Sequence, residues 1–214
     1  NNSSRFGKYF ELKFDLANGG TPRGGYITNY LLEKSRVVKP GPGERAFHIF
    51  YQLCAGLPRD VKEGLNISSP EQFNLLYQSG VTEINNEGGR VDDAKEFKDT
   101  VHSMSTVGIF PDEQNEFFLV VAIVMHLSNV DFYEASVDGA EGSQVADESA
   151  LRCAAELLEV DAGALAYALT YRTLTTMAPG GKVETYQVPM NPVQARSARD
   201  ALAKDIYSRI FDKL

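Results

Sequence analysis

The sequence has no tryptophan, and only two cysteines and three histidines among its 214 residues. Two cysteines cannot build a disulfide framework, and with three scattered histidines they do not form the spacing of a zinc site. Cys54 and Cys153 each fall in an apolar pattern typical of a helix, so we expect buried free thiols. The longest apolar run, residues 117–125, is shorter than the ~20 residues that cross a bilayer.

Basic residues are also fewer than acidic ones. Lysine and arginine number 21 against 29 aspartates and glutamates, which leaves a net charge of −8. Proteins that bind nucleic acids present a basic surface, so this balance argues against that class. The hydrophobic content of 43% is enough for a packed core in one or two domains.

The first part of the chain predicts a β-hairpin. Over Lys8–Asp15 the apolar residues alternate with charged ones, which places Phe10, Leu12 and Phe14 on one face of a strand. Glycine, asparagine and proline dominate residues 17–25, and Tyr26–Leu32 reads as a second strand. We therefore expect two strands joined by a long loop.

Most of the remaining chain has helical periodicity. Helices are predicted over residues 44–55, 58–63, 70–76, 92–107, 111–127, 149–158, 162–169 and 192–214. A second hairpin is predicted from residues 171–176 and 183–188. Residues 134–148 carry five acidic side chains and no basic one, which favours a solvated flexible loop. The fold class is thus mixed α/β, predominantly helical.

The residues Asn2-Ser3-Ser4-Arg5-Phe6-Gly7-Lys8 carry the strongest chemical signal. One serine hydroxyl can complete the coordination shell of Mg²⁺, and a second can contact an attacking water. A guanidinium can hold a loop closed through an ion pair with a carboxylate. Taken alone, the same residues also suit a turn or a helix cap.

This segment resembles switch I of myosin motor domains, and further segments resemble that family in the same order along the chain. They are Tyr30-Leu31-Leu32-Glu33-Lys34-Ser35-Arg36-Val37, Gly43-Glu44-Arg45-Ala46-Phe47-His48-Ile49-Phe50-Tyr51-Gln52-Leu53, Met125-His126-Leu127-Ser128-Asn129-Val130, and Asp200-Ala201-Leu202-Ala203-Lys204 with Ile206-Tyr207 and Arg209-Ile210-Phe211. Ala46 stands where the family has asparagine and Ser128 where it has glycine, which puts the local hydrogen bonding or turn geometry in doubt.

The resemblance implies a partial motor domain of the P-loop NTPase class over residues 1–214, mainly the upper 50-kDa subdomain. Residues 1–38 would hold switch I and two strands of the central sheet, and 39–170 a helical region with the acidic loop 134–148. Residues 171–190 would form an actin-binding hairpin loop, and 191–214 a long helix. We expect a piece of a longer protein, with the phosphate-binding loop before Asn1 and switch II beyond Leu214.

The resemblance also implies the roles of the first residues. The cofactors would be ATP and Mg²⁺. Asn1, Asn2, Ser3 and Ser4 would bind the nucleotide, with Ser4 as the Mg²⁺ ligand and Ser3 holding the lytic water. Arg5 would pair with a switch II glutamate outside this chain.

Actin contacts are implied for Arg172, Lys182 and Glu184. Counting from Asp200, Glu184 occupies the position where the family has an acidic or phosphorylatable residue. A permanent carboxylate there predicts competence for actin without a kinase, and Thr185 should not be a regulatory site. The alternative is that Glu184 is an ordinary solvated charge on the hairpin, with no role in actin binding. The acidic segment 134–148 matches the place of another actin-facing loop, although actin is itself acidic.

Several other polar residues read as structural. We expect His48, His102 and His126 to be packed and hydrogen-bonded. Glu44 and Arg45 should form ion pairs that hold the fold, and Arg36 should join a polar network near the nucleotide cleft.

The leading hypothesis is therefore an actin-based ATPase motor, most similar to class I myosins, in the cytoplasm on the actin cytoskeleton. Its partners would be the actin filament, the rest of the motor domain, and light chains or calmodulin on a neck outside this chain. No nucleic acid or direct membrane contact is implied for this segment, and alone it should not hydrolyse ATP. The alternative is a non-enzymatic actin tether, and a third reading is an interaction domain unrelated to nucleotides.

Overall fold

The computed structural model describes residues 5–86, 89–137, 139–177 and 181–214. Two long helices, α5 (Pro111–Leu127) and α8 (Pro192–Lys213), pack against each other and organise the chain. Helix α5 begins at a proline followed by Asp112 and Glu113, which favour the positive end of the helix dipole. Helix α8 begins with a capping box in which Asn191 and Gln194 bond each other's backbone. Both helices agree with the sequence-based prediction.

The core lies where α5 meets α1 (His48–Gly56) and α4 (Asp93–Thr106). Phe50 and Leu53 of α1 are fully buried there, and α1 packs on α4, which contributes the buried Phe97. Gly56 permits this contact, because a Cβ on it would lie 2.4 Å from the Cβ of Phe97. A side chain at position 56 would therefore force α1 and α4 apart.

Shorter elements surround this core. They are the helices α2 (Arg59–Gly64), α3 (Asn74–Tyr77), α6 (Glu148–Leu157) and α7 (Ala162–Thr170), and the 3-10 segments η1 (Leu16–Asn18), η2 (Lys34–Val37) and η3 (Pro70–Gln72). In the described part of the chain, no helix combines the length and apolar character needed to cross a membrane.

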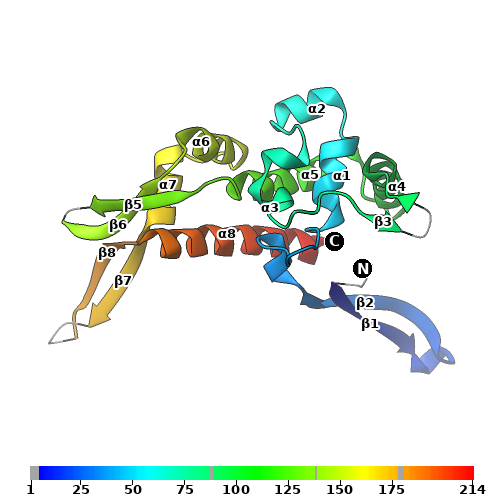
Figure 1. Ribbon diagram of the computed structural model, residues 1–214. Coiled ribbons are helices and arrows are strands. Elements are labelled where there is room, and N and C mark those ends of the chain that lie inside the picture. The colour runs from blue at the N-terminus through cyan, green and yellow to red at the C-terminus, as the bar shows by residue number, and fades with distance from the viewer. Residues whose placement is uncertain (1–4, 87–88, 138, 178–180) are drawn as a thin grey trace.

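The strands of the described residues pair only as antiparallel hairpins. These are β1 (Phe6–Asp15) with β2 (Thr21–Leu32), β3 (Asn85–Asn86) with β4 (Gly89–Arg90), β5 (Phe132–Val137) with β6 (Ala140–Val145), and β7 (Tyr171–Met177) with β8 (Val183–Pro189). Figure 1 places β1–β2 near one end of α8 and the pairs β5–β6 and β7–β8 near the other.

Two predictions about loops were wrong. The acidic segment 134–148 is not a loop, because β5 and β6 pair from Phe132↔Val145 to Val137↔Ala140 and α6 starts at Glu148. Phe132 at the start of β5 is buried in the core cluster, which ties this end of the hairpin to the rest of the chain. The loop of the first hairpin is also shorter than expected, since β2 begins at Thr21 after a single 3-10 turn.

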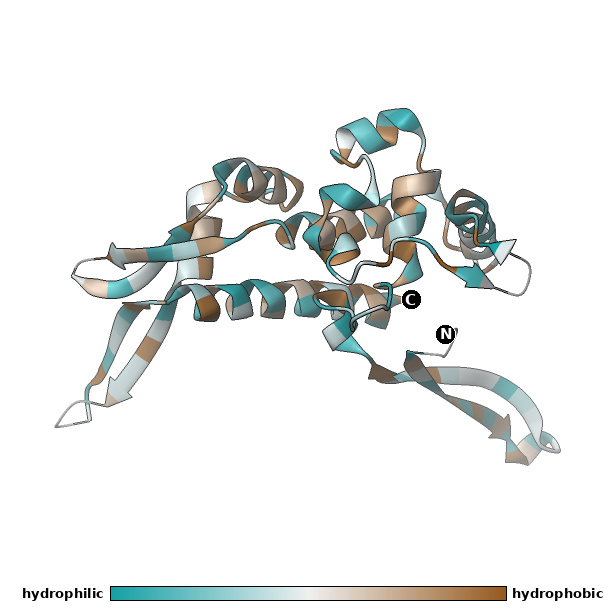
Figure 2. Ribbon diagram, in the orientation of Figure 1, coloured by the Kyte–Doolittle hydropathy of each residue, from teal (hydrophilic) through white to brown (hydrophobic). Residues whose placement is uncertain are grey.

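The β1–β2 hairpin carries large apolar side chains that the described residues leave uncovered. Phe10, Leu12 and Phe14 are 50–55% exposed, and Figure 2 shows hydrophobic residues along both strands.

The cysteines and histidines divide between core and surface. Cys54 and His126 are buried as predicted, whereas Cys153 is only partly covered. His48 and His102 lie at exposed positions, so the prediction that they are packed was wrong. Both follow helical periodicity, but on the outward faces of α1 and α4.

Candidate functional site

Arg5 is the one residue of the predicted nucleotide site that the structure describes; Asn1, Asn2, Ser3 and Ser4 lie outside the described residues. Its guanidinium lies 3.3 Å from a carboxylate oxygen of Glu33 and 3.6 Å from one of Glu44, and its side chain is 26% exposed. The backbone fixes this placement, because the amide of Glu33 donates to the carbonyl of Arg5 at 2.9 Å. Arg5 is thus held next to two carboxylates.

A second guanidinium shares the same carboxylates. Arg36 is buried; its Nε donates to Glu33 at 3.0 Å, and its terminal nitrogens bond Glu44 and, at 2.6 Å, the carbonyl of Arg45. The hydrogen bond from Arg36 lowers the pKa of Glu44. Arg36 therefore binds both carboxylates closely, while Arg5 rests on them at longer distances and keeps access to solvent.

Arg45 forms a separate buried pair beneath this cluster. Its terminal nitrogen lies 2.8 Å from Asp93 of α4, and its guanidinium stacks 3.7 Å from the centre of the Tyr51 ring. The Tyr51 hydroxyl donates to the carbonyl of Leu76 and accepts from the backbone amide of Ala46. The predicted ion pairs of Glu44 and Arg45 and the polar network of Arg36 are therefore confirmed.

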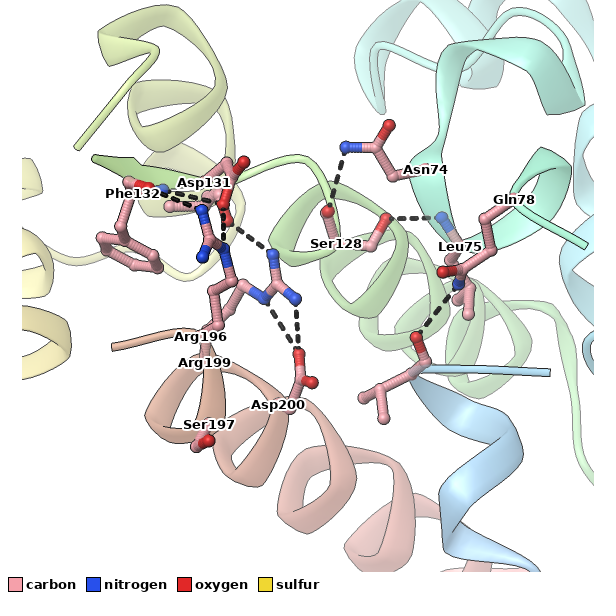
Figure 3. A network of polar contacts seen from close by, with 12 residues as sticks. Asn74, Leu75, Gln78, Ser128, Asp131, Phe132, Arg196, Ser197, Arg199 and Asp200 are labelled. Carbon is pink, nitrogen blue, oxygen red and sulfur yellow. Dashed lines mark hydrogen bonds and ion pairs between the residues drawn. The ribbon is translucent and has the colours of Figure 1, made fainter. Parts of the chain in front are cut away.

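The two departures from the family pattern are accommodated locally. The bond from the Ala46 amide to Tyr51 needs no side chain at position 46. The Ser128 hydroxyl donates to the carbonyl of Met125 and accepts from the amide of Leu75, at 2.6 and 3.3 Å. Figure 3 shows Ser128 facing Asn74 and Leu75 of α3. A serine thus joins α5 to α3 where the family pattern has no side chain.

The second group of predicted site residues lies on or beside the β7–β8 hairpin. Arg172 pairs with Val188, and Glu184 with Thr176, so that Arg172 and Glu184 share one face of the two-stranded sheet. The hydroxyl of Tyr186 donates to Glu184, and this bond raises the pKa of Tyr186. Lys182 is exposed just before β8.

The base of this hairpin is tied to its neighbours by polar contacts. The hydroxyl of Ser143 in β6 donates to the carbonyl of Met190 at 2.8 Å. From α8, Arg196 donates to Asp131 and to the carbonyl of Phe132, at 2.6 and 2.7 Å, in the network of Figure 3. The hairpins β5–β6 and β7–β8 are therefore fixed to the start of α8.

The end of α8 meets the other hairpin. Asn29 of β2 donates to the carbonyl of Phe211 at 3.0 Å and to Asp212 at 2.9 Å. The rings of Phe6 and Phe211 meet edge to face, 5.3 Å apart. With 22 residues, α8 spans about 33 Å, so the structure places Arg5 and the hairpin residues Arg172 and Glu184 at opposite ends of one helix.

Some of these residues gave no functional signal in the sequence. Tyr186 follows Glu184 by two positions in a strand, a spacing that puts both side chains on one face. Asn29, Asp131 and Arg196 act across long sequence separations, which the chain pattern alone does not reveal. Within the described ranges, histidine, cysteine and carboxylate side chains gather nowhere in a group of three or more that could hold a metal.

Comparison with known proteins identifies the family: the chain belongs to the myosin head (motor domain) family, which it matches over residues 1–214. It is 46% identical over 213 residues to myosin heavy chain IB of Acanthamoeba castellanii, covering 99% of this chain and 17% of that protein. It is 45% identical over 215 residues to the myosin ID heavy chain of Dictyostelium discoideum, covering 99% and 19%. Against the myosin IB heavy chain of the same organism the identity is 43% over 217 residues, covering 100% and 19%. The chain thus spans about a fifth of the length of these curated relatives.

Proposed function

We propose that this chain is the switch I and actin-facing part of an actin-based motor that hydrolyses ATP. The observation that carries the proposal is the match to the motor-domain family along the whole chain, combined with Arg5 resting on two carboxylates that Arg36 already satisfies. Arg5 can therefore pair with a third carboxylate while Glu33 and Glu44 keep their ion pairs with Arg36.

In this proposal Ser4 is the Mg²⁺ ligand and Ser3 holds the lytic water. Asn1 and Asn2 brace the nucleotide phosphates. Mg²⁺ held at Ser4 would supply positive charge against the phosphates, and Arg5 would close the loop by pairing with a carboxylate from elsewhere in the motor domain, which would exclude water from the site. The residues here supply only part of the site, so the isolated chain is expected to be inactive.

Arg172, Lys182 and Glu184 are proposed to contact the actin filament. Arg172 and Glu184 share one face of the β7–β8 hairpin, and the hairpin is anchored by Ser143 and Arg196. Such charges steer association and set specificity more than they add affinity. The rest of the motor domain, light chains or calmodulin, and an actin-associated cytoplasmic location complete the proposal.

The test is the ATPase activity of the complete head that contains this chain, measured with and without actin filaments. We expect Mg²⁺-dependent hydrolysis that actin accelerates. A head that co-sediments with actin but does not hydrolyse ATP would support the tether and contradict the motor. A head that neither binds actin nor hydrolyses ATP would contradict both.

A further inference from the structure

Three segments of the chain meet at a cluster of side chains beside the C-terminal end of α5. His126 lies in the last turn of α5, Cys153 lies in the middle of α6, and Asn66 follows α2. The sulfur of Cys153 lies 3.4 Å from Nδ1 of His126, and the Asn66 amide donates to it at 3.3 Å. The ion-pair network and the hairpins make no use of these groups.

The protonation of His126 follows from its partners. Its Nε2 lies 2.8 Å from the carbonyl of Leu65, and a carbonyl only accepts, so Nε2 carries the hydrogen. Nδ1 is then left with its lone pair facing Cys153, and the thiol hydrogen points to it. The imidazole ring is held in this orientation by Phe73, whose ring meets it edge to face at 5.1 Å.

Burial lowers the pKa of His126, which favours the neutral imidazole in the resting protein. The hydrogen bond to Leu65 opposes this effect and favours the imidazolium that forms when the thiol proton is taken up. The amide of Asn66 faces the sulfur on which negative charge then develops. The cluster therefore supplies both a base and a donor for a nucleophilic sulfur.

We propose that Cys153 is a reactive thiol, activated by His126 and Asn66, and that it is a site of oxidation by small hydroperoxides. Cys153 is partly covered and Asn66 is exposed, which favours a small reagent. The sulfur attacks one peroxide oxygen while its proton passes to Nδ1. The O–O bond breaks, and the leaving hydroxide takes the proton from Nδ1 as water. Cys153 becomes a sulfenic acid, oxidised by two electrons, and the peroxide is reduced.

The other cysteine provides an internal control. Cys54 is 4% exposed, and burial raises its pKa to about 12. Such a thiol is inert at neutral pH. We therefore expect Cys153 to react with peroxide and Cys54 to remain unreactive in the same molecule.

The experiment uses the full-length protein that contains this chain, treated with hydrogen peroxide in the presence of dimedone, with modified peptides followed by mass spectrometry. We expect labelling of Cys153 at least about tenfold faster than that of Cys54. His126→Phe, which keeps a ring against Phe73, should slow Cys153 labelling about tenfold. The control His48→Phe changes an exposed histidine of α1 and should leave the rate unchanged.

Asn66→Gly gives a second variant, because Asn66 has a φ of +50°, which glycine adopts without strain. It should slow Cys153 labelling severalfold while the melting temperature is kept. If His126→Phe does not fold, Asn66→Gly decides the question. The proposal is overturned if Cys153 of the wild-type protein is labelled no faster than Cys54, or if the folded variants are labelled as fast as the wild type.

Discussion

Asn29 and Phe211 join the two ends of the described chain: the side-chain amide of Asn29 in β2 donates to the carbonyl of Phe211 in the last turn of α8, at 3.0 Å. Residues separated by most of the sequence thus hold the hairpin that follows Arg5 against the helix that begins at the β7–β8 hairpin. In the proposed motor, this contact holds the nucleotide-side hairpin to the end of α8 that lies opposite the β7–β8 hairpin.

The first prediction concerns this contact. Asn29→Ala removes the donors to Phe211 and Asp212, and we expect a loss of about 1 kcal/mol in the free energy of unfolding of the complete head. Urea unfolding measures it. The control Asn18→Ala removes an amide that donates to Asp15 within the same exposed turn, and its effect should be smaller. An Asn29→Ala protein as stable as the wild type would show that the contact contributes nothing.

The second prediction concerns the buried pair of Arg45 and Asp93, whose side chains are 3% and 18% exposed. Arg45→Met leaves Asp93 without its partner in a covered site, so we expect destabilisation of about 3–5 kcal/mol. The double variant Arg45→Met with Asp93→Leu should recover much of that loss, because neither charge is then stranded. Chemical denaturation of the four proteins in the cycle measures the coupling. Additive losses of stability in the two single variants and the double variant would contradict coupling between Arg45 and Asp93.

The third prediction concerns the pH dependence that Glu44 brings. The hydrogen bond from Arg36 lowers the Glu44 pKa below its ordinary value of 4.5. The stabilising pair is therefore fully formed above that value and is lost as the pH falls through the lower folded-state pKa. Glu44→Gln removes the titration, so the wild type should melt higher than the variant at pH 7, and the difference should shrink below about pH 4.5. A difference that is constant with pH would be evidence against the pairing.

The fourth prediction concerns Glu184 on the β7–β8 hairpin. Under the proposed function its carboxylate supplies charge permanently, so treatment with a phosphatase should not change actin-activated ATPase activity. Glu184→Ala should lower that activity severalfold by weakening the approach to actin. Thr185→Ala, whose side chain faces the other side of the strand, is the control and should behave like the wild type. Unchanged actin-activated ATPase activity in Glu184→Ala would contradict a role for Glu184 in actin binding.

Local physical chemistry accounts for what the sequence could predict. Helices α5 and α8 begin at Pro111 and Pro192, where proline and acidic or capping residues mark the start. The β7–β8 hairpin was predicted from two stretches of strand-forming residues on either side of a turn, and the two strands pair as expected. The acidic hairpin β5–β6 was missed because the burial of Phe132 depends on residues far along the chain. The same reason explains His102, whose exposure depends on which face of α4 meets the core.

The candidate site divides in the same way. The hydroxyl and guanidinium pattern of residues 2–5 is visible in the sequence, as is the charge at position 184. The sharing of Glu33 and Glu44 between Arg5 and Arg36 requires the turn that brings residue 44 back beside residue 5, and the pairing of Arg45 with Asp93 requires the packing of α1 on α4. Such contacts depend on tertiary structure rather than on spacing along the chain.

The most direct measurement of the proposed function is single-turnover phosphate formation by the complete head carrying Arg5→Ala. Arg5 is proposed to close the loop over the nucleotide, so we expect the hydrolysis step to slow by at least about tenfold, with ATP binding much less affected. The matched control is Arg23→Ala, an arginine paired with Asp15 at the exposed end of the β1–β2 hairpin with 70% of its side chain accessible. Hydrolysis by Arg5→Ala at the rate of the wild type and of Arg23→Ala would contradict the proposed role of Arg5.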